Sequence, residues 1–137
     1  MAALSAARNT PERAGEVFGF PVKGSTTVYQ GSLVALNAGY AAPGATATGR
    51  IAVGRAEETV ANAGSDGAVA VNVKRGVFKF GNSAAGDAIA QADVGADCYI
   101  VDDQTVAKTS ATNTRSIAGK IVAVDSDGVW VQVGLGL

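Results

Sequence analysis

The sequence predicts an all-β chain: a small single-domain β-barrel or β-sandwich of short antiparallel strands, preceded by a flexible N-terminal arm. Valine-rich stretches recur along the chain between clusters of Gly, Asp, Asn and Ser, which is typical of short strands joined by turns. In residues 68–74 valine alternates with alanine, asparagine and lysine, and in residues 129–133 with tryptophan and glutamine, as in a strand with one buried face. A length of 137 residues accommodates one domain of this kind.

Residues 1–14 are rich in Ala, Ser and Arg and show no sustained apolar period, so they are predicted to form the flexible arm. Residues 15–137 then form the β domain. Residues 37–49 and 62–67 are predicted to be a loop and a turn, because Gly, Ala, Asn and Ser dominate them. The strands predicted in the first half are residues 17–23, 26–29, 32–36 and 50–56.

Residues 68–74 and 77–80 are predicted to be two halves of one bent strand, because Gly76 interrupts an otherwise continuous pattern. The stretch that follows is less regular, with a short strand predicted at 88–90 and a single helical turn at 91–95. If the strands before and after the middle of the chain are neighbours, four aromatic rings would stack on one face. These rings are Phe18, Phe20, Phe78 and Phe80.

The last third of the chain predicts two hairpins. Residues 98–101 and 106–107 form the first, and residues 117–124 and 129–133 form the second. The second hairpin turns at an Asp-Gly pair, where glycine can adopt a positive φ. A polar loop at 108–115 joins the two hairpins.

The predicted core is thin. Hydrophobic residues make up 47% of the chain, but many of them are alanines, and aromatic residues make up only 6%. Burial stabilises by about 25 cal/mol per Å² of apolar surface, so a core of Val and Ala contributes little for each residue ordered. We therefore expect the domain to draw part of its stability from sister copies or from a larger surface.

Composition disfavours several classes of partner. A net charge of −1 provides no broad basic field for a phosphate backbone, so no nucleic-acid partner is predicted. No apolar run reaches the roughly 18 residues of a membrane span, so no membrane partner is predicted. Arg8, Pro11 and Arg13 interrupt the N-terminus, which argues against a signal peptide and favours a protein made and kept in a cytoplasm. Cys98 is single and is predicted to be a buried small hydrophobe.

Candidate chemistry is sparse. The chain has no histidine, the commonest catalytic base and metal ligand. Asp125, Asp127 and Gly128 resemble the opening of a calcium loop but run directly into a strand, which favours a hairpin turn. No glycine motif for nucleotides follows a strand, and most carboxylates lie in predicted turns. The sequence therefore predicts no enzyme: no catalytic residue, no cofactor and no metal.

Lys74, Arg75 and Lys79 form a small basic cluster around Gly76. The simpler interpretation is a solvated strand face. The functional alternative is contact with an acidic patch on a partner, where arginine offers bidentate pairing.

Two blocks of this sequence carry motifs that go beyond a general strand-and-turn pattern. The first is Ala-Val-Asn-Val-Lys-Arg-Gly-Val-Phe at 70–78. The second runs over 92–131 and contains Tyr-Ile-Val-Asp-Asp-Gln-Thr-Val, then Ala-Gly-Lys-Ile-Val-Ala-Val, then Gly-Val-Trp-Val. Together these blocks resemble the capsid decoration, or cement, proteins of tailed phages. In that family a strand ends in Arg-Gly-Val, and a Val-Asp-Asp segment precedes a closing Asp-Gly-Val-Trp-Val. The similarity covers roughly residues 16–133, and the arm lies outside it.

The resemblance implies a β-rich structural protein on the capsid exterior of a virion, made in the cytoplasm of a bacterial host. Such proteins bridge copies of the major capsid protein and stabilise the shell, commonly as homotrimers. An arm that orders on a neighbour could add a strand to an exposed sheet edge. The candidate contact residues are accordingly Arg8 and Arg13 of the arm, with Lys74, Arg75 and Lys79 of the basic cluster.

Three alternatives stay open. A carbohydrate-binding β-sandwich that attaches a virion or a cell to glycans would present exposed aromatic residues in a groove, and Trp130 and Tyr99 are the candidates in the sequence. A small carboxylate-based hydrolase would hold facing acids in a cleft. Another phage structural part, such as a tail-tube subunit, would assemble into rings.

Overall fold

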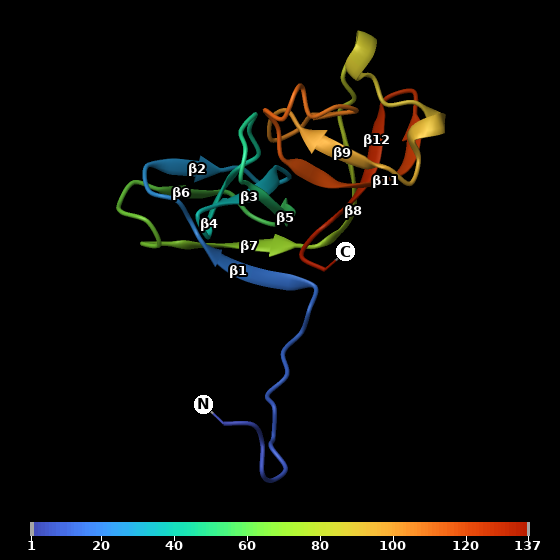
Figure 1. Ribbon diagram of the computed structural model, residues 1–137. Helices are drawn as coiled ribbons and strands as arrows, with labels where there is room; N and C mark the ends of the chain where they lie inside the picture. The colour runs from blue at the N-terminus through green and yellow to red at the C-terminus, as the bar shows by residue number, and fades with distance from the viewer. Residues whose placement is uncertain (1, 137) are drawn as a thin grey trace.

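The computed structural model describes residues 2–136 and confirms the all-β class. Two five-stranded antiparallel sheets and one two-stranded sheet make up the body (Figure 1). The first sheet has the order β1-β7-β5-β3-β4, the second has the order β10-β9-β11-β12-β8, and β2 pairs with β6. The sheets do not close into a barrel, so the architecture is sandwich-like.

The strands and short 3-10 helices have the following bounds. The first sheet and the two-stranded sheet contain β1 (Val17–Pro21), β2 (Thr26–Val28), β3 (Leu33–Asn37), β4 (Tyr40–Pro43), β5 (Ile51–Ala56), β6 (Val60–Asn62) and β7 (Ala70–Lys74). The second sheet and its connections contain β8 (Gly76–Phe80), η1 (Ala85–Asp87), η2 (Gln91–Asp93), β9 (Asp97–Ile100), β10 (Val106–Ala107), β11 (Ile117–Asp125) and β12 (Gly128–Val133).

Strand β3 lies between two hydrophobic cores because successive side chains of a strand point to opposite faces. Leu33 and Ala35 join the core formed with the second sheet, and Val34 joins the core formed with β5, β7 and the β2-β6 pair. The largest fully buried side chains are Leu33, Ile100 and Ile121, and valines make up most of the rest. The core therefore consists mainly of valine and other small apolar side chains, as the sequence predicts.

The second hairpin of the last third shows why alternation is a reliable signal. Val129, Val131 and Val133 of β12 are fully buried, whereas Trp130 on the opposite face is exposed. β12 pairs with β11 on one side and with β8 on the other, so it is a central strand. Its predicted pairing with β11 and the predicted pairing of β9 with β10 are both confirmed.

The chain passes from the first sheet to the second between β7 and β8, with only Arg75 between the two strands. This bend agrees with the prediction that residues 68–74 and 77–80 are two halves of one strand bent at Gly76. It also separates the aromatic residues, because β1 pairs with β7 whereas β8 pairs with β12. Phe18 and Phe20 contact each other at 6.1 Å between ring centroids, but Phe78 and Phe80 pack in the other core, so the two strands are not neighbours and the four rings do not stack on one face.

Three local predictions are corrected. The predicted loop 37–49 contains β4, because Ala38 and Gly39 adopt φ of 52° and 88° and reverse the chain in a tight turn. A short strand, β6, precedes the turn at 62–67. The predicted strand at 88–90 is irregular, and it lies between η1 and η2.

Residues 2–14 are exposed throughout and contain no strand or helix. Figure 1 shows this arm extending from β1 away from the sheets. We refer to residues 2–14 as the arm. Within the described residues, no helix is long and apolar enough to cross a membrane.

Candidate functional site

The basic residues at the β7–β8 junction lie beside the root of the arm. The backbone N–H of Arg75 donates a hydrogen bond to the carbonyl oxygen of Glu16 (2.9 Å), where the arm enters β1. The guanidinium of Arg75 donates to the carbonyl oxygen of Leu135 (3.0 Å) and so joins the junction to the C-terminal segment. Lys74 occupies the end of β7, opposite Val17 in β1.

Arg13 of the arm lies close to this junction. Its guanidinium carbon is 5.2 Å from the ring centroid of Phe18, a cation–π contact. Phe18 pairs with Val73, the residue before Lys74. Arg13, Lys74 and Arg75 therefore all lie near the point where the arm enters β1, with the Lys74 side chain on the opposite face of the sheet from Phe18; we call these three residues the arm-base cluster. Arg8 lies farther out and donates a hydrogen bond to Thr10 (2.8 Å).

Lys79 has a different environment from the arm-base cluster. Its ammonium bonds the carboxylates of Asp127 (2.6 Å) and Asp125 (3.2 Å), at the tip of the β11–β12 hairpin. It also lies 5.7 Å from the ring of Trp130. The hydrogen bond with Asp127 raises the pKa of Lys79. The charge of Lys79 is therefore largely satisfied within this chain, and an acidic partner would have to compete with two aspartates.

Three exposed apolar side chains lie in the arm, in β1 and in β8. Leu4 is 72% exposed, and Val17 and Val77 are 44% and 45% exposed. Single exposed apolar residues are ordinary, but these lie on the arm, on the edge strand that follows it and on β8. This part of the surface therefore combines cations with uncovered apolar area. The sequence patterns did not indicate it, because exposure of Val17 and Val77 depends on strand pairing.

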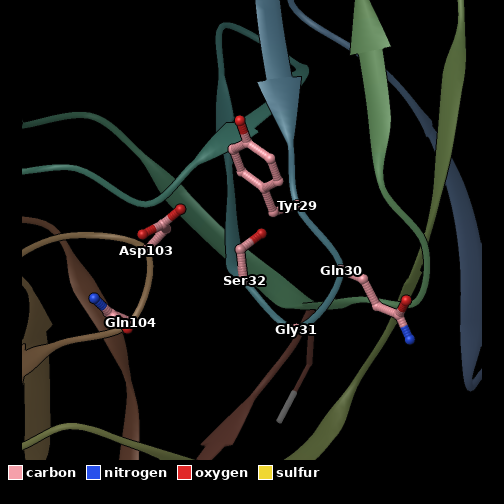
Figure 2. A pocket seen from close by; sticks show the side chains of 6 residues that line it. All are labelled: Tyr29, Gln30, Gly31, Ser32, Asp103 and Gln104. Atoms are coloured by element: carbon pink, nitrogen blue, oxygen red, sulfur yellow. The ribbon is translucent and has the colours of Figure 1, made fainter.

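Figure 2 shows a shallow hollow between the β2–β3 connection and the β9–β10 turn. Its volume is about 210 Å³, below the several hundred Å³ of an ordinary small-molecule site. Tyr29 at its rim is 61% exposed. The other lining residues are Gln30, Gly31, Ser32, Asp103 and Gln104.

Two further hollows lie near the start of β5 and β11. One, of about 450 Å³, is lined by polar loop residues together with Tyr99, Arg50 and Arg115. The other, of about 240 Å³, is lined partly by the exposed pair Ile51 and Ile117. Neither contains a carboxylate among its lining residues. In the described part of the chain, no three acidic, Cys or His side chains are grouped as they would be to hold a metal ion.

Cys98 is buried in the core, as predicted. Burial raises the pKa of its thiol to about 12. Because the thiolate is the reactive form, native protein at pH 8 should be labelled by a thiol reagent at least about 100-fold more slowly than urea-unfolded protein. Equal labelling rates in the two states would contradict this burial.

Acidic side chains at two turns predict a loss of stability in acid. The backbone N–H of Gly24 (2.7 Å) lowers the pKa of Asp66, and the hydroxyl of Thr109 (2.5 Å) lowers that of Asp87, both from 3.8. A carboxylate with a lowered pKa in the folded state stabilises it above the unfolded pKa, and this stabilisation is lost as the pH falls. We expect the melting temperature to fall below about pH 4, and to fall less in Asp66→Asn and Asp87→Asn when followed by circular dichroism.

Together, the fold and these contacts define an all-β structure with a protruding arm, a cationic and apolar arm base and the three surface hollows described above. Comparison with protein-family models, with curated proteins and with solved structures finds no match for this chain. Its function must therefore be argued from its own residues and from the sequence motifs described above.

Proposed function

We propose that this chain is a structural virion protein that binds the outer surface of an assembled phage capsid and stabilises it by bridging neighbouring copies of the major capsid protein. The observation that carries the proposal is the arm, because residues 2–14 are exposed throughout and Arg13 contacts the ring of Phe18 at its base. A segment of this kind can order on a neighbouring protein by adding a strand or by wrapping its surface.

The arm-base cluster supports this proposal. Arg13, Lys74 and Arg75 offer cations beside exposed Val17 and Val77, a combination that suits a protein surface with acidic and apolar patches. Each contact is weak, since exposed charges contribute little individually. Many copies on one shell, each bridging two subunits, would still bind strongly through multivalency.

The motifs that carry the resemblance support a structural role. The Asp-Asp-Gln-Thr segment forms the turn between β9 and β10, where the side chain of Asp102 accepts a hydrogen bond from the N–H of Gln104 (2.9 Å). The Asp-Gly-Val-Trp-Val segment forms the β11–β12 turn and the start of β12. These residues build the second sheet, so the resemblance concerns how the body is built.

Co-sedimentation with expanded empty shells of the protein's own virus tests the proposal. Intact protein should pellet with the shells, and deletion of residues 2–14 should reduce the bound fraction at least about tenfold, since it removes the segment proposed to order on the shell. Arg8→Ala combined with Arg13→Ala should give a smaller loss. Lys108→Ala, which removes an exposed cation near Asp93, is the matched control and should bind normally.

Failure of intact protein to pellet with expanded shells would overturn the proposal. Undiminished binding of the deletion variant would show that the arm is not the contact. Heating provides an independent measurement: shells carrying the protein should release DNA or lose integrity at a higher temperature than bare shells.

Self-association as a trimer is part of the proposal, and the thin valine-rich core supports it. Sedimentation velocity across a range of concentrations should show a trimer or a concentration-dependent monomer–trimer equilibrium. A hexameric ring would instead favour a tail-tube component.

One observation favours the carbohydrate-binding alternative. Tyr29 is exposed at the rim of the hollow in Figure 2, beside the carboxylate of Asp103 and the amide of Gln104, and aromatic, acidic and amide groups together can recognise a sugar. A glycan array would show binding that Tyr29→Ala abolishes. Absence of binding on the array would exclude this alternative for the glycans displayed.

A further inference from the structure

Strand β8 lies at the edge of the second sheet, and no strand within residues 2–136 pairs with its outer side. We propose that residues 11–15 of the arm add to this edge as a strand, continuing the pairing of β1 with β7 past the bend and onto β8 of the same chain. The inference does not depend on capsid binding.

The backbone groups of β7 and β8 show which side of β8 is open. Arg75 donates its N–H to Glu16 on the β1 side, and Asn72 accepts from Glu57 on the opposite side. Backbone groups of residues two apart point to the same side of a strand. Those of Val77 and Lys79 therefore point to the β1 side of the strand, beyond the end of β1.

The hydrogen bonds of β11 and β12 leave the same side of β8 open. Ile121 exchanges hydrogen bonds with residues 95 and 96, beside β9, so its neighbour Lys120 faces β12 and its partner Gln132 faces β11. Val131 and Val133 must then face β8, where they lie opposite Phe78 and Gly76. The groups of the intervening Val77 thus point away from β12.

The open stretch is short and has defined ends. At one end Arg75 is bonded to Glu16, and at the other end Gly81 donates to Gln104 and accepts from Val106. Between them, no hydrogen bond from residues 2–136 reaches the outer side of Val77 or Lys79. An open edge of this kind is a template for an added strand.

The pairing of β1 with β7 fixes which arm residues would fill the gap. Val17 lies opposite Lys74, and Glu16 bonds Arg75. Continuing this antiparallel register places Ala14 opposite Val77 and Glu12 opposite Lys79. No loop is needed between the two pairings, since the arm runs directly into β1.

The arm residues suit these positions. Ala14 would cover Val77, which is now 45% exposed. Glu12 would lie opposite Lys79, where its carboxylate would share the ammonium with Asp125 and Asp127. Pro11 falls opposite Phe80, where the backbone of an added strand points outward, so its missing N–H removes no bond of the ladder.

Two features favour the arm of the same chain over the arm of a second copy. Gly15 falls opposite Gly76, so both strands have a glycine where β7 gives way to β8. The arm is also held beside the edge by the bond between Glu16 and Arg75, which gives it a high effective concentration. Docking would cover the edge against pairing between molecules and would leave residues 2–10 exposed.

Disulfide trapping tests the proposal. Directly opposite residues that exchange hydrogen bonds have Cα atoms about 5.5 Å apart, within disulfide range. Ala14→Cys with Val77→Cys should form an intramolecular disulfide at least about tenfold faster than Arg13→Cys with Val77→Cys, because in a docked strand residue 13 points to the other face. Buried Cys98 does not interfere.

Equal rates for the two pairs would overturn the proposal, because they would show a freely moving arm. A disulfide formed mainly between molecules would overturn it in favour of arm exchange between copies. Neither outcome bears on shell binding, which is measured separately.

Hydrogen exchange gives a second measurement that needs no cysteine. The amides of Val77 and Lys79 should exchange at least about tenfold more slowly in the intact chain than after deletion of residues 2–14. Ala14→Pro removes an N–H that would bond Val77 and should abolish this protection, whereas Arg13→Pro removes an outward N–H and should keep most of it. Identical exchange in intact and truncated protein would refute docking.

Discussion

Gly119→Ala is expected to destabilise the fold by about 3 kcal/mol or more. Gly119 lies in β11 at an irregularity in its pairing with β9, where its backbone approaches β12 closely. An added methyl would overlap the carbonyl oxygen of Gln132 and would lie 3.0 Å from the Cγ1 of Val131. The first obstacle is backbone, so no side-chain rotation relieves it, and the two central strands of the second sheet would have to separate.

Urea unfolding followed by circular dichroism measures this effect, and Gly86→Ala is the matched control. Gly86 lies in η1 with no atom within 4 Å of the position of an added Cβ, so its change should stay within about 0.5 kcal/mol of the parent. If the two variants proved equally stable, the close approach of β11 to β12 would be contradicted.

Local alternation was enough to predict β12 and its hairpin partner. Their valines recur at every second residue, and the Asp-Gly turn fixes which strands meet. Contacts between strands distant in sequence were not predictable in this way. The pairing of Phe18 with Val73 depends on which edges find each other over more than fifty residues, and no period within either strand encodes that choice.

The missed strands have weak local signals. Tyr40–Pro43 contains two alanines and a proline, which favour loops, and it becomes an edge strand only because the Ala38–Gly39 turn returns the chain along β3. Val60–Asn62 has three residues, too few to show alternation, and its pairing with β2 supplies the missing information.

The candidate contact residues could be predicted as cations but not by their surroundings. Lys79 lies across from Trp130 in the pairing of β8 with β12, which brings it to Asp125 and Asp127 at the hairpin tip. That pairing is nonlocal. The same register leaves the outer edge of β8 open, a feature that only the strand order reveals.

Asn62→Ala is expected to destabilise the fold by about 2 kcal/mol. Asn62 is only 3% exposed, and its side chain holds the turn after β6 to the end of β1. Its amide donates to the carbonyl oxygens of Val22 (3.0 Å) and Ser65 (2.9 Å), and its oxygen accepts from the N–H of Gly64 (2.9 Å). Alanine removes these bonds, together with a longer one to the carbonyl oxygen of Lys23 (3.4 Å), and leaves the N–H of Gly64 without its partner.

Asn72→Ala is the control for this substitution, because Asn72 is exposed and its amide bonds only the carboxylate of Glu58 (2.9 Å) at the surface. Its cost should be within about 0.5 kcal/mol. The same urea titration compares the two variants, and slow exchange of the Gly64 amide should be lost in Asn62→Ala alone. A buried amide that bonds several backbone groups orders a turn that glycine and serine would otherwise leave mobile. Equal stability of the two variants would therefore contradict this role, because the turn would then be stable without the Asn62 side chain.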